Sequence, residues 1–286
     1  MGPESRLHQI LRTLGRLFRR RPAGAIGLCA VTIIAIVAII GVWIVPYGPT
    51  DANPAAQLEP PGPSHWFGTD VSGMDVFSRV VAAARNDLAI GVAATLLALA
   101  IGTPLGIVSG YVRGWHSELI SRGADILQAF PIFILAMALV ALLGQKITNV
   151  ILVIAFLTSP IYLRLMRGQT YALRQTPFVE AGIVVGNAPR RIISRYIFPM
   201  AIPPALTQVS VNVGIAILLT AGLSFVGAGV RVPTPEWGSM ISIGAPEMIT
   251  GQWWVATFPG LAIVVTVLSF SLLGRAIEFL TDPRQR

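Results

Sequence analysis

The chain has 286 residues, of which 54% are hydrophobic and only 12% are charged, a composition far more apolar than that of a soluble domain. Several apolar runs reach 18 residues or more, and about 20 helical residues are enough to cross a hydrocarbon core about 30 Å thick. These runs are continuous rather than alternating, which disfavours a membrane β-barrel. The net charge of +8 is compatible with nucleic-acid binding, so the positions of the basic residues must decide that question.

The N-terminal segment 1–22 is basic and leads into the first apolar run, 23–45. This run is longer than the apolar core of a secretory signal, and no Ala-x-Ala-like cleavage site follows it, so we expect an uncleaved signal-anchor helix. The single cysteine, Cys29, lies inside the run, and the three histidines lie in separate segments. The sequence therefore predicts no internal disulfide and no metal cluster.

We predict an all-α polytopic membrane protein with six transmembrane helices, at about 24–45, 88–110, 126–143, 148–163, 203–226 and 256–274. None of these spans contains an ionisable residue. If the N-terminus is cytoplasmic, 17 of the 21 lysines and arginines fall on the cytoplasmic side and four on the other. By the positive-inside rule, both termini are then cytoplasmic. This bias explains the net charge as a consequence of topology and removes the argument for nucleic-acid binding.

Two segments on the predicted external side are long. The first, 46–87, begins with several prolines, and near its end the spacing of apolar residues predicts a short interfacial helix containing Val76, Phe77, Val80 and Val81. The second, 227–254, ends in Trp253 and Trp254, a pair typical of the membrane–water interface. We expect the remaining segment, 88–286, to form a five-helix transmembrane core with a cytoplasmic loop at 164–200.

Small residues recur every four positions in the second predicted span, at Gly102, Gly106 and Gly110. In lipid, where hydrophobicity alone does not drive helices together, this spacing allows two helices to approach closely. The pattern predicts a packing face and carries no evidence for a ligand site.

The sequence argues against an enzyme and against an internal ATP-driven motor. The only lysine, Lys146, lies on the predicted external side, so the chain has no phosphate-binding loop with its lysine. A proton- or sodium-coupled transporter usually carries ionisable groups within its spans, and none is found here. Neutral polar groups do occur in the fifth span, and Gln208 and Asn212 either hydrogen-bond between helices or line a translocation path. We infer that the energy for any transport comes from outside this subunit.

The loop 164–200 carries the signals of two short helices. Thr176 can start the first, with Pro177 in its first turn, and Gly186-Asn187 can end it. Pro189 can then open a second helix that carries Arg190, Arg191 and Arg195. The arginines could face lipid headgroups, as in an interfacial segment. The alternative is that the two helices form a docking surface on the cytoplasmic face.

The residues of this loop resemble a known motif. Glu180-Ala181-Gly182, then Gly186, then Ile197-Phe198-Pro199 are similar to the EAA loop of ABC-importer permeases, with Gly182 in place of the second alanine. Matches to the second permease of dipeptide, oligopeptide and nickel importers run along the whole chain. They include the external run from His65 to Arg79, with Met74 where a basic residue is usual, and the segments 223–227, 233–238 and 282–284.

The resemblance implies the type I ABC-importer permease fold and a multi-pass subunit of a bacterial cytoplasmic membrane. It also implies four kinds of partner: a homologous permease that completes a heterodimer, two cytoplasmic ATPase subunits, an external solute-binding protein and membrane lipid. The chain itself would hold no cofactor, because ATP and Mg²⁺ would be bound by the ATPase subunits. The rival interpretation is a self-sufficient secondary transporter or channel. The sequence leaves the cargo open among dipeptides, oligopeptides, nickel chelates and other small solutes.

Residue roles follow from the same resemblance. The residues expected to couple to the ATPase are Glu180, Ala181, Gly182, Gly186, Arg190, Arg191 and Pro199. Those expected on the external side, toward the binding protein, are Gly68, Thr69, Asp70, Asp75, Arg79 and Trp237. Because glycine is a poorer helix former than alanine by about 1 kcal/mol, Gly182 is expected to loosen the first coupling helix.

Overall fold

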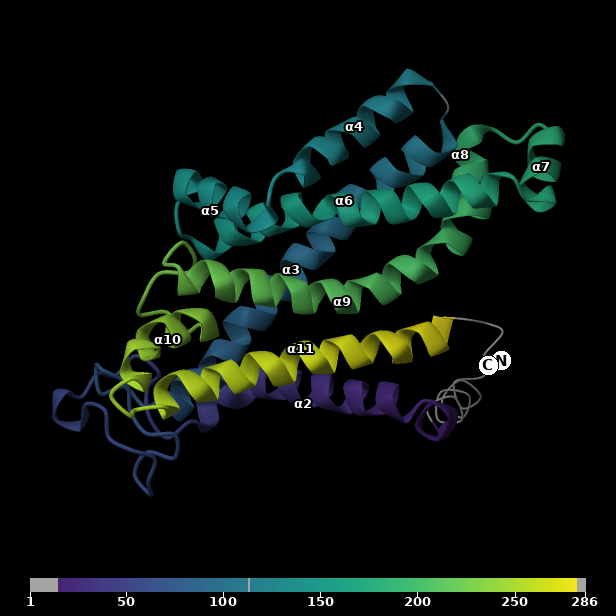
Figure 1. Ribbon diagram of the computed structural model, residues 1–286. Coiled ribbons are helices and arrows are strands. Elements are labelled where there is room, and N and C mark those ends of the chain that lie inside the picture. The colour runs from purple at the N-terminus through teal and green to yellow at the C-terminus, as the bar shows by residue number, and fades with distance from the viewer. Residues whose placement is uncertain (1–14, 113, 282–286) are drawn as a thin grey trace.

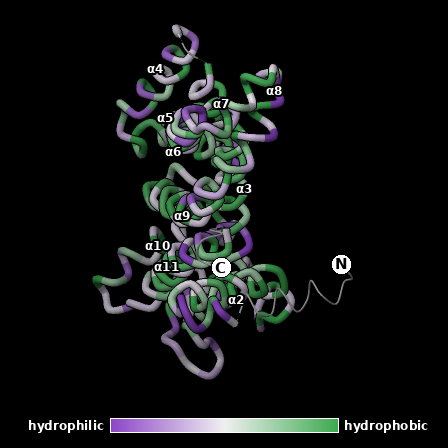
Figure 2. The backbone as a smooth tube through the Cα atoms, turned by 90° about the vertical axis from the view of Figure 1, so that its right-hand side faces the viewer, coloured by the Kyte–Doolittle hydropathy of each residue, from purple (hydrophilic) through white to green (hydrophobic). Residues whose placement is uncertain are grey.

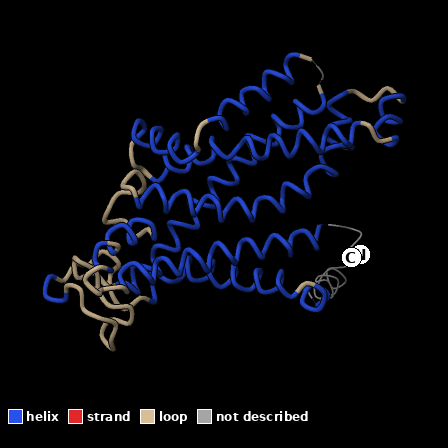
Figure 3. Tube along the Cα trace, in the orientation of Figure 1, coloured by secondary structure: helices blue, strands red, loops and turns tan. Residues whose placement is uncertain are grey.

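The computed structural model describes residues 15–112 and 114–281, and this part of the chain is built from helices without strands (Figures 1 and 3). The predicted matches at 282–284 and the first 14 residues lie outside the described residues. Five helical segments are long and apolar enough to cross a membrane: α2 (Pro22–Ile44), α3 (Val76–Tyr111), α6 (Ile147–Arg174), α9 (Phe198–Phe225, with the turns before it) and α11 (Trp254–Thr281).

A sixth span is broken into two helices. α4 (Trp115–Ala129) and α5 (Ile132–Leu143) are bent by 91° at Phe130-Pro131. Proline disfavours helical backbone in the residue before it, and Phe130 is accordingly extended, with ψ 142°. The third predicted span is therefore present as a bent pair rather than one straight helix.

The bundle has two ends, which carry different structures (Figure 1). At one end lie the start of α2, the end of α11 and the short helix α7 (Pro177–Val184); we call this end the α7 face. At the other end lie the loop 46–75 and α10 (Trp237–Gly244); we call it the α10 face. In Figure 2, hydrophobic residues run through the long helices, while hydrophilic residues are frequent along α4 and around α8 (Pro189–Ile192).

The short interfacial helix expected near residue 76 does not exist as a separate element. Val76 is instead the first residue of α3, which continues for 36 residues to Tyr111 and is about 54 Å long at 1.5 Å per residue. No proline or glycine interrupts the chain between the helix start and the apolar run. Val76 and Ala83 are completely buried rather than interfacial. The loop on this side accordingly ends at residue 75, not 87.

The glycine stripe of α3 packs against α6, as predicted. A Cβ atom built on Gly102 would lie 2.7 Å from Cβ of Tyr162, and one built on Gly106 would lie 2.8 Å from Cβ of Met166. One built on Gly110 would similarly meet α6. Both separations are shorter than side-chain contacts allow, so α3 and α6 pack more closely than any larger residue would permit.

The second short helix of loop 164–200 is continuous with the following span. α8 passes through a π-helical turn at Ile193–Ile197 and then directly into α9. Pro199 follows the π-helical turn, so its missing N–H group falls where the regular hydrogen-bond pattern of the helix is already interrupted. The prediction of two short helices is thus correct for α7 but wrong for the second, which forms the beginning of a 37-residue helical segment.

Candidate functional site at the two ends of the bundle

The turn between α7 and α8 has the geometry predicted for Gly186. This residue adopts φ +85°, a backbone conformation that residues other than glycine and asparagine rarely occupy. The N–H of Gly186 donates to the carbonyl of Ile183 at 2.9 Å, and the N–H of Asn187 donates to the carbonyl of Gly182 at 3.3 Å. These two bonds close the C-terminus of α7.

The two arms of this loop are held together by their own contacts. Nδ2 of Asn187 donates to the carbonyl of Gly182 at 2.9 Å, and the rings of Phe178 and Tyr196 lie 5.0 Å apart between centroids. Beneath them, a small apolar core is completely buried; it consists of Val179, Ile192 and Ile197. Loop residues 175–199 therefore form a braced unit rather than a flexible connection.

Gly182 lies inside this braced unit. A Cβ atom at this position would stand 3.0 Å from Cδ1 of Ile192 and 3.1 Å from Cε1 of Tyr196, both tighter than ordinary contacts. The structure thus gives the glycine a packing reason, since it lets the two arms approach. The expectation that Gly182 loosens α7 stays untested.

The outer side of the loop exposes apolar residues next to charged ones. Val184 and Val185 are 85% and 81% exposed at the tip, and Glu180 is exposed on the same short helix. Of the other predicted coupling residues, Ala181, Gly186, Arg190, Arg191 and Pro199 are also exposed. Neighbouring exposed apolar side chains on a rigid element are typical of an interaction surface. The sequence analysis did not include Val184 and Val185 among the coupling residues, although their position directly before Gly186-Asn187 places them at the tip of the loop.

At the α10 face, the predicted external residues tie loop 46–75 to the bundle. Gly68 has φ +72°, and its carbonyl accepts from the N–H of Val76 at 3.0 Å. The hydroxyl of Thr69 accepts from the N–H of Glu59 at 2.8 Å, and its carbonyl accepts from Nε1 of Trp254 at 3.1 Å. These bonds join the loop to the beginnings of α3 and α11.

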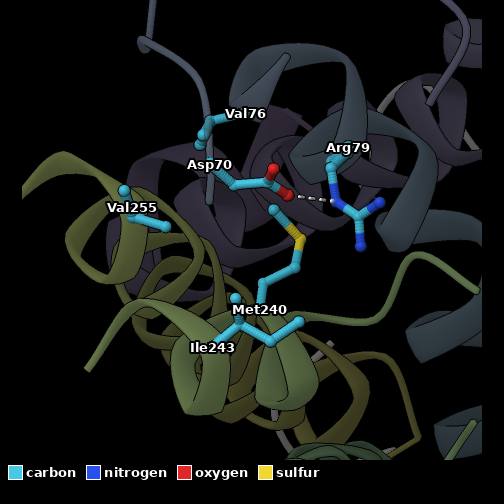
Figure 4. Close-up of a pocket in the computed structure, with 6 residues that line it drawn as sticks. All are labelled: Asp70, Val76, Arg79, Met240, Ile243 and Val255. Atoms are coloured by element: carbon cyan, nitrogen blue, oxygen red, sulfur yellow. Dashed lines mark ion pairs between the residues drawn. The ribbon is translucent and has the colours of Figure 1, made fainter. Parts of the chain in front are cut away.

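Two carboxylates organise the start of α3. Asp75 caps the helix, because its Oδ2 accepts from the N–H of Ser78 at 2.7 Å, and its Oδ1 lies 2.9 Å from Nδ1 of His65. Asp70 pairs with Arg79, with 3.6 Å between Oδ2 and Nε (Figure 4). The guanidinium also donates to the carbonyl of Pro49 at 3.0 Å and contacts the sulfur of Met74. Met74 therefore covers a buried guanidinium.

Figure 4 shows that this ion pair lies over the side chain of Met240 from α10, beside Val76 and Val255, at a small pocket. Nearby, Trp237 begins α10; its ring Nε1 donates to the carbonyl of Val80 at 2.9 Å. The six residues predicted for the external side are all buried, and the exposed fraction of Arg79 is only 1%. In this chain they build the α10 face from within, and contact with a binding protein stays a prediction.

The two polar residues predicted as path-lining pair with each other. Nε2 of Gln208 donates to Oδ1 of Asn212 at 3.0 Å, one turn apart on α9. Asn212 is 1% exposed, whereas Gln208 is half-buried. The bond lies within one helix and not between two. A role in lining the path stays a prediction, and Gln208 is the better placed of the two.

Comparison with known proteins identifies the family of this chain. The sequence profile of the binding-protein-dependent transport system inner membrane component matches residues 102–286. The chain belongs to this family. The profile of the N-terminal transmembrane domain of oligopeptide transport permease C also matches, at residues 10–61. The protein is therefore a permease subunit of an ABC importer of the peptide and nickel branch, a transport component and not an enzyme.

Relatives of this permease span nearly its whole length. It is 41% identical over 271 residues to the glutathione transport system permease protein GsiD of Escherichia coli, covering 94% of the chain and 89% of GsiD. It is 37% identical over 268 residues to the dipeptide transport system permease protein DppC of Alkalihalophilus pseudofirmus, covering 94% and 88%. The inward-facing methionine ABC transporter MetNI superposes with TM-score 0.60 at 17% identity, over 71% of the permease and 96% of the MetNI chain. The MetNI match confirms the type I importer fold.

Proposed function

We propose that this permease forms half of a translocation path for peptides or similar small solutes, and that its α7 face docks onto a cytoplasmic ATPase. A homologous permease completes the path, and an external binding protein delivers the cargo. The observation that carries the proposal is the braced loop 175–199 with its exposed apolar tip. The dipeptide and glutathione cargoes in the relatives' names support a peptide-like solute.

The orientation follows from the distribution of charge. The α7 face carries the arginines of α6 and of the 175–199 loop, whereas the α10 face carries few basic residues. The positive-inside rule places the face with more arginine in the cytoplasm. Both termini are then cytoplasmic, and loop 46–75 with α10 is external.

The braced loop can transmit a displacement into the membrane because of where its arms lead. One arm continues from α6, and the other runs without interruption through α8 into α9. α6 is in turn joined to its neighbours by arginines: Arg164 pairs with Asp125 of α4 at 2.6 Å, and Arg174 donates to the carbonyl of Tyr111 at the end of α3. ATP and Mg²⁺ would be bound by the ATPase subunits, whose closure would push on the loop.

Reconstitution tests the function directly. Liposomes that contain this permease, its homologous partner and the ATPase subunits are expected to take up peptide when ATP and the binding protein are supplied. The permease alone should give no uptake, because the chain has no phosphate-binding loop with its lysine through which ATP could supply the energy. Peptide flux through the purified chain without ATPase subunits would instead establish the rival interpretation, a self-sufficient transporter or channel.

The turn at Gly186 provides a sharper test of docking. Gly186→Val is expected to reduce ATPase co-purification by about tenfold, since a β-branched residue at φ +85° strains the turn by roughly 1–2 kcal/mol or redirects the tip. Gly186→Asn is the matched control, because asparagine tolerates this conformation and nothing lies within 4 Å of the added Cβ. Equal co-purification of both variants would show that the turn geometry is not needed.

A further inference from the structure

Two buried carboxyl groups meet where α3 joins the start of α10. Asp87 of α3 is 1% exposed, and Glu236, directly before α10, is fully buried. Oδ2 of Asp87 accepts from the N–H of Trp237 at 3.1 Å. Glu236 accepts with both of its oxygens, Oε1 from the N–H of Gly238 at 2.8 Å and Oε2 from the N–H of Ser239 at 2.7 Å. The first three N–H groups of α10 are thus all bound by these two side chains.

The hydrogen bonds favour one place for a proton in this pair. Both oxygens of Glu236 accept from backbone N–H groups, and such bonds favour the ionised carboxylate at this group. Oδ1 of Asp87 is buried and receives no hydrogen bond from a described residue. Asp87 and Glu236 nevertheless accept from the adjacent N–H groups of Trp237 and Gly238, which brings the two carboxyl groups together. Two carboxyl groups can bond only if one is protonated, and the orphaned Oδ1 is the atom that is free to carry the proton.

Within residues 15–112 and 114–281, no cation is placed to balance a second negative charge here. α2 and α9 contain no Asp, Glu, His, Lys or Arg, and the charged residues of α11, Arg275 and Glu278, lie near its opposite end. On α3, Arg79 is paired with Asp70, and Arg85 is exposed. Arg231, in the segment before α10, is also exposed. Two adjacent carboxylates in a buried, low-dielectric place repel strongly, which favours the singly protonated pair.

We propose that Asp87 and Glu236 share one proton and that the protonated pair clamps α10 onto α3 at the external face. Oδ1–H of Asp87 donates to the Glu236 carboxylate; at higher pH this proton passes to solvent, and the repulsion between two carboxylates weakens the clamp. The other hydrogen bonds of the clamp do not depend on a titratable group. Nδ2 of Asn86 donates to the carbonyl of Pro235 at 2.7 Å, and Nε1 of Trp237 donates to the carbonyl of Val80. The two acids are positioning residues, and the proposal is independent of the cargo.

Amide hydrogen exchange in the assembled transporter tests the clamp. In the wild type, the protection factor of residues 237–239, corrected for intrinsic exchange, is expected to fall by about tenfold or more between a mildly acidic and an alkaline pH, because release of one proton changes an equilibrium up to tenfold per pH unit. Asp87→Asn should keep high protection at both values. Its amide nitrogen can donate where the protonated oxygen donated, and its oxygen can still accept from Trp237.

Two further variants complete the test. Glu236→Gln is expected to lose protection at both pH values, because an amide nitrogen cannot accept from Gly238 or Ser239. Asp51→Asn, at an exposed acid of loop 46–75, should retain the wild-type pH profile. Protection that does not change with pH in the wild type would overturn the proposal. An Asp87→Asn variant that keeps the wild-type pH dependence would also overturn it. The same holds if Asp87→Asn loses as much protection as Asp87→Ala, because the two acids would then act without a shared proton.

Discussion

Replacing both Val184 and Val185 with aspartate should abolish ATPase co-purification and ATP-driven uptake while leaving the permease folded. The two side chains are 85% and 81% exposed, so their substitution removes no packing within this chain. If they insert into an apolar groove of the ATPase, two unpaired carboxylates would have to be desolvated there. A loss of about 3 kcal/mol or more in binding corresponds to an affinity at least about 100-fold lower.

Pull-down from detergent extracts, together with uptake by reconstituted liposomes, measures this effect. The matched control is Val232→Asp, because Val232 is 59% exposed but belongs to the opposite face. We expect the control to retain the ATPase fully. If the double variant also retained it and transported normally, the tip of loop 175–199 would not be the docking surface.

The second large effect is expected at the α10 face, from Asp70→Ala. This change leaves the guanidinium of Arg79, which is 1% exposed, without its carboxylate. Removing one partner of a buried ion pair typically costs about 3–5 kcal/mol. The thermal midpoint in detergent should therefore fall by roughly 10 °C. Tryptophan fluorescence can follow this transition, because Trp237 and Trp254 both pack at this end.

A second substitution separates the cost of burying an unpaired charge from the contribution of the ion pair itself. Asp70→Ala combined with Arg79→Met should recover more than half of the lost stability, since replacing both buried charges with apolar groups is often nearly neutral. Asp125→Ala breaks an exposed ion pair with Arg164 and should cost less than about 1 kcal/mol. A midpoint that is equally unaffected by Asp70→Ala and Asp125→Ala would mean that the Asp70–Arg79 pair does not hold the loop.

Local signals in the sequence were sufficient for the long helices and for the α7 turn. Continuous apolar runs predicted the spans. The glycines of α3 predicted a close contact with another helix, which the structure confirms at Tyr162 and Met166 of α6. Pro177 and Gly186 placed α7 because fixed φ at one end and positive φ at the other are properties of single residues. The EAA-like pattern in the same loop pointed to the family to which the chain belongs.

The errors arose where local signals do not decide between alternatives. The spacing of Val76, Phe77 and Val80 indicates a helix, but whether it is interfacial depends on what packs against it. Trp237 and Val255 do so here, and both come from segments more than 150 residues away. The signal at Pro189 predicted a separate second helix, but α8 continues through a π-helical turn into α9 and past Pro199.

The sequence alone determined which segments are apolar, where the positive charges lie and which branch of permeases the chain resembles, because these are properties of composition and order. Only the tertiary structure decided what the polar residues near the start of α3 do. Asp70, Asp75 and Arg79 have the residue types of a recognition site, yet they lie buried and hold loop 46–75 on α3. Asp87 and Glu236 are 149 positions apart, and their contact depends on α10 folding back over α3. Burial and long-range contact arise from packing, which no local pattern encodes.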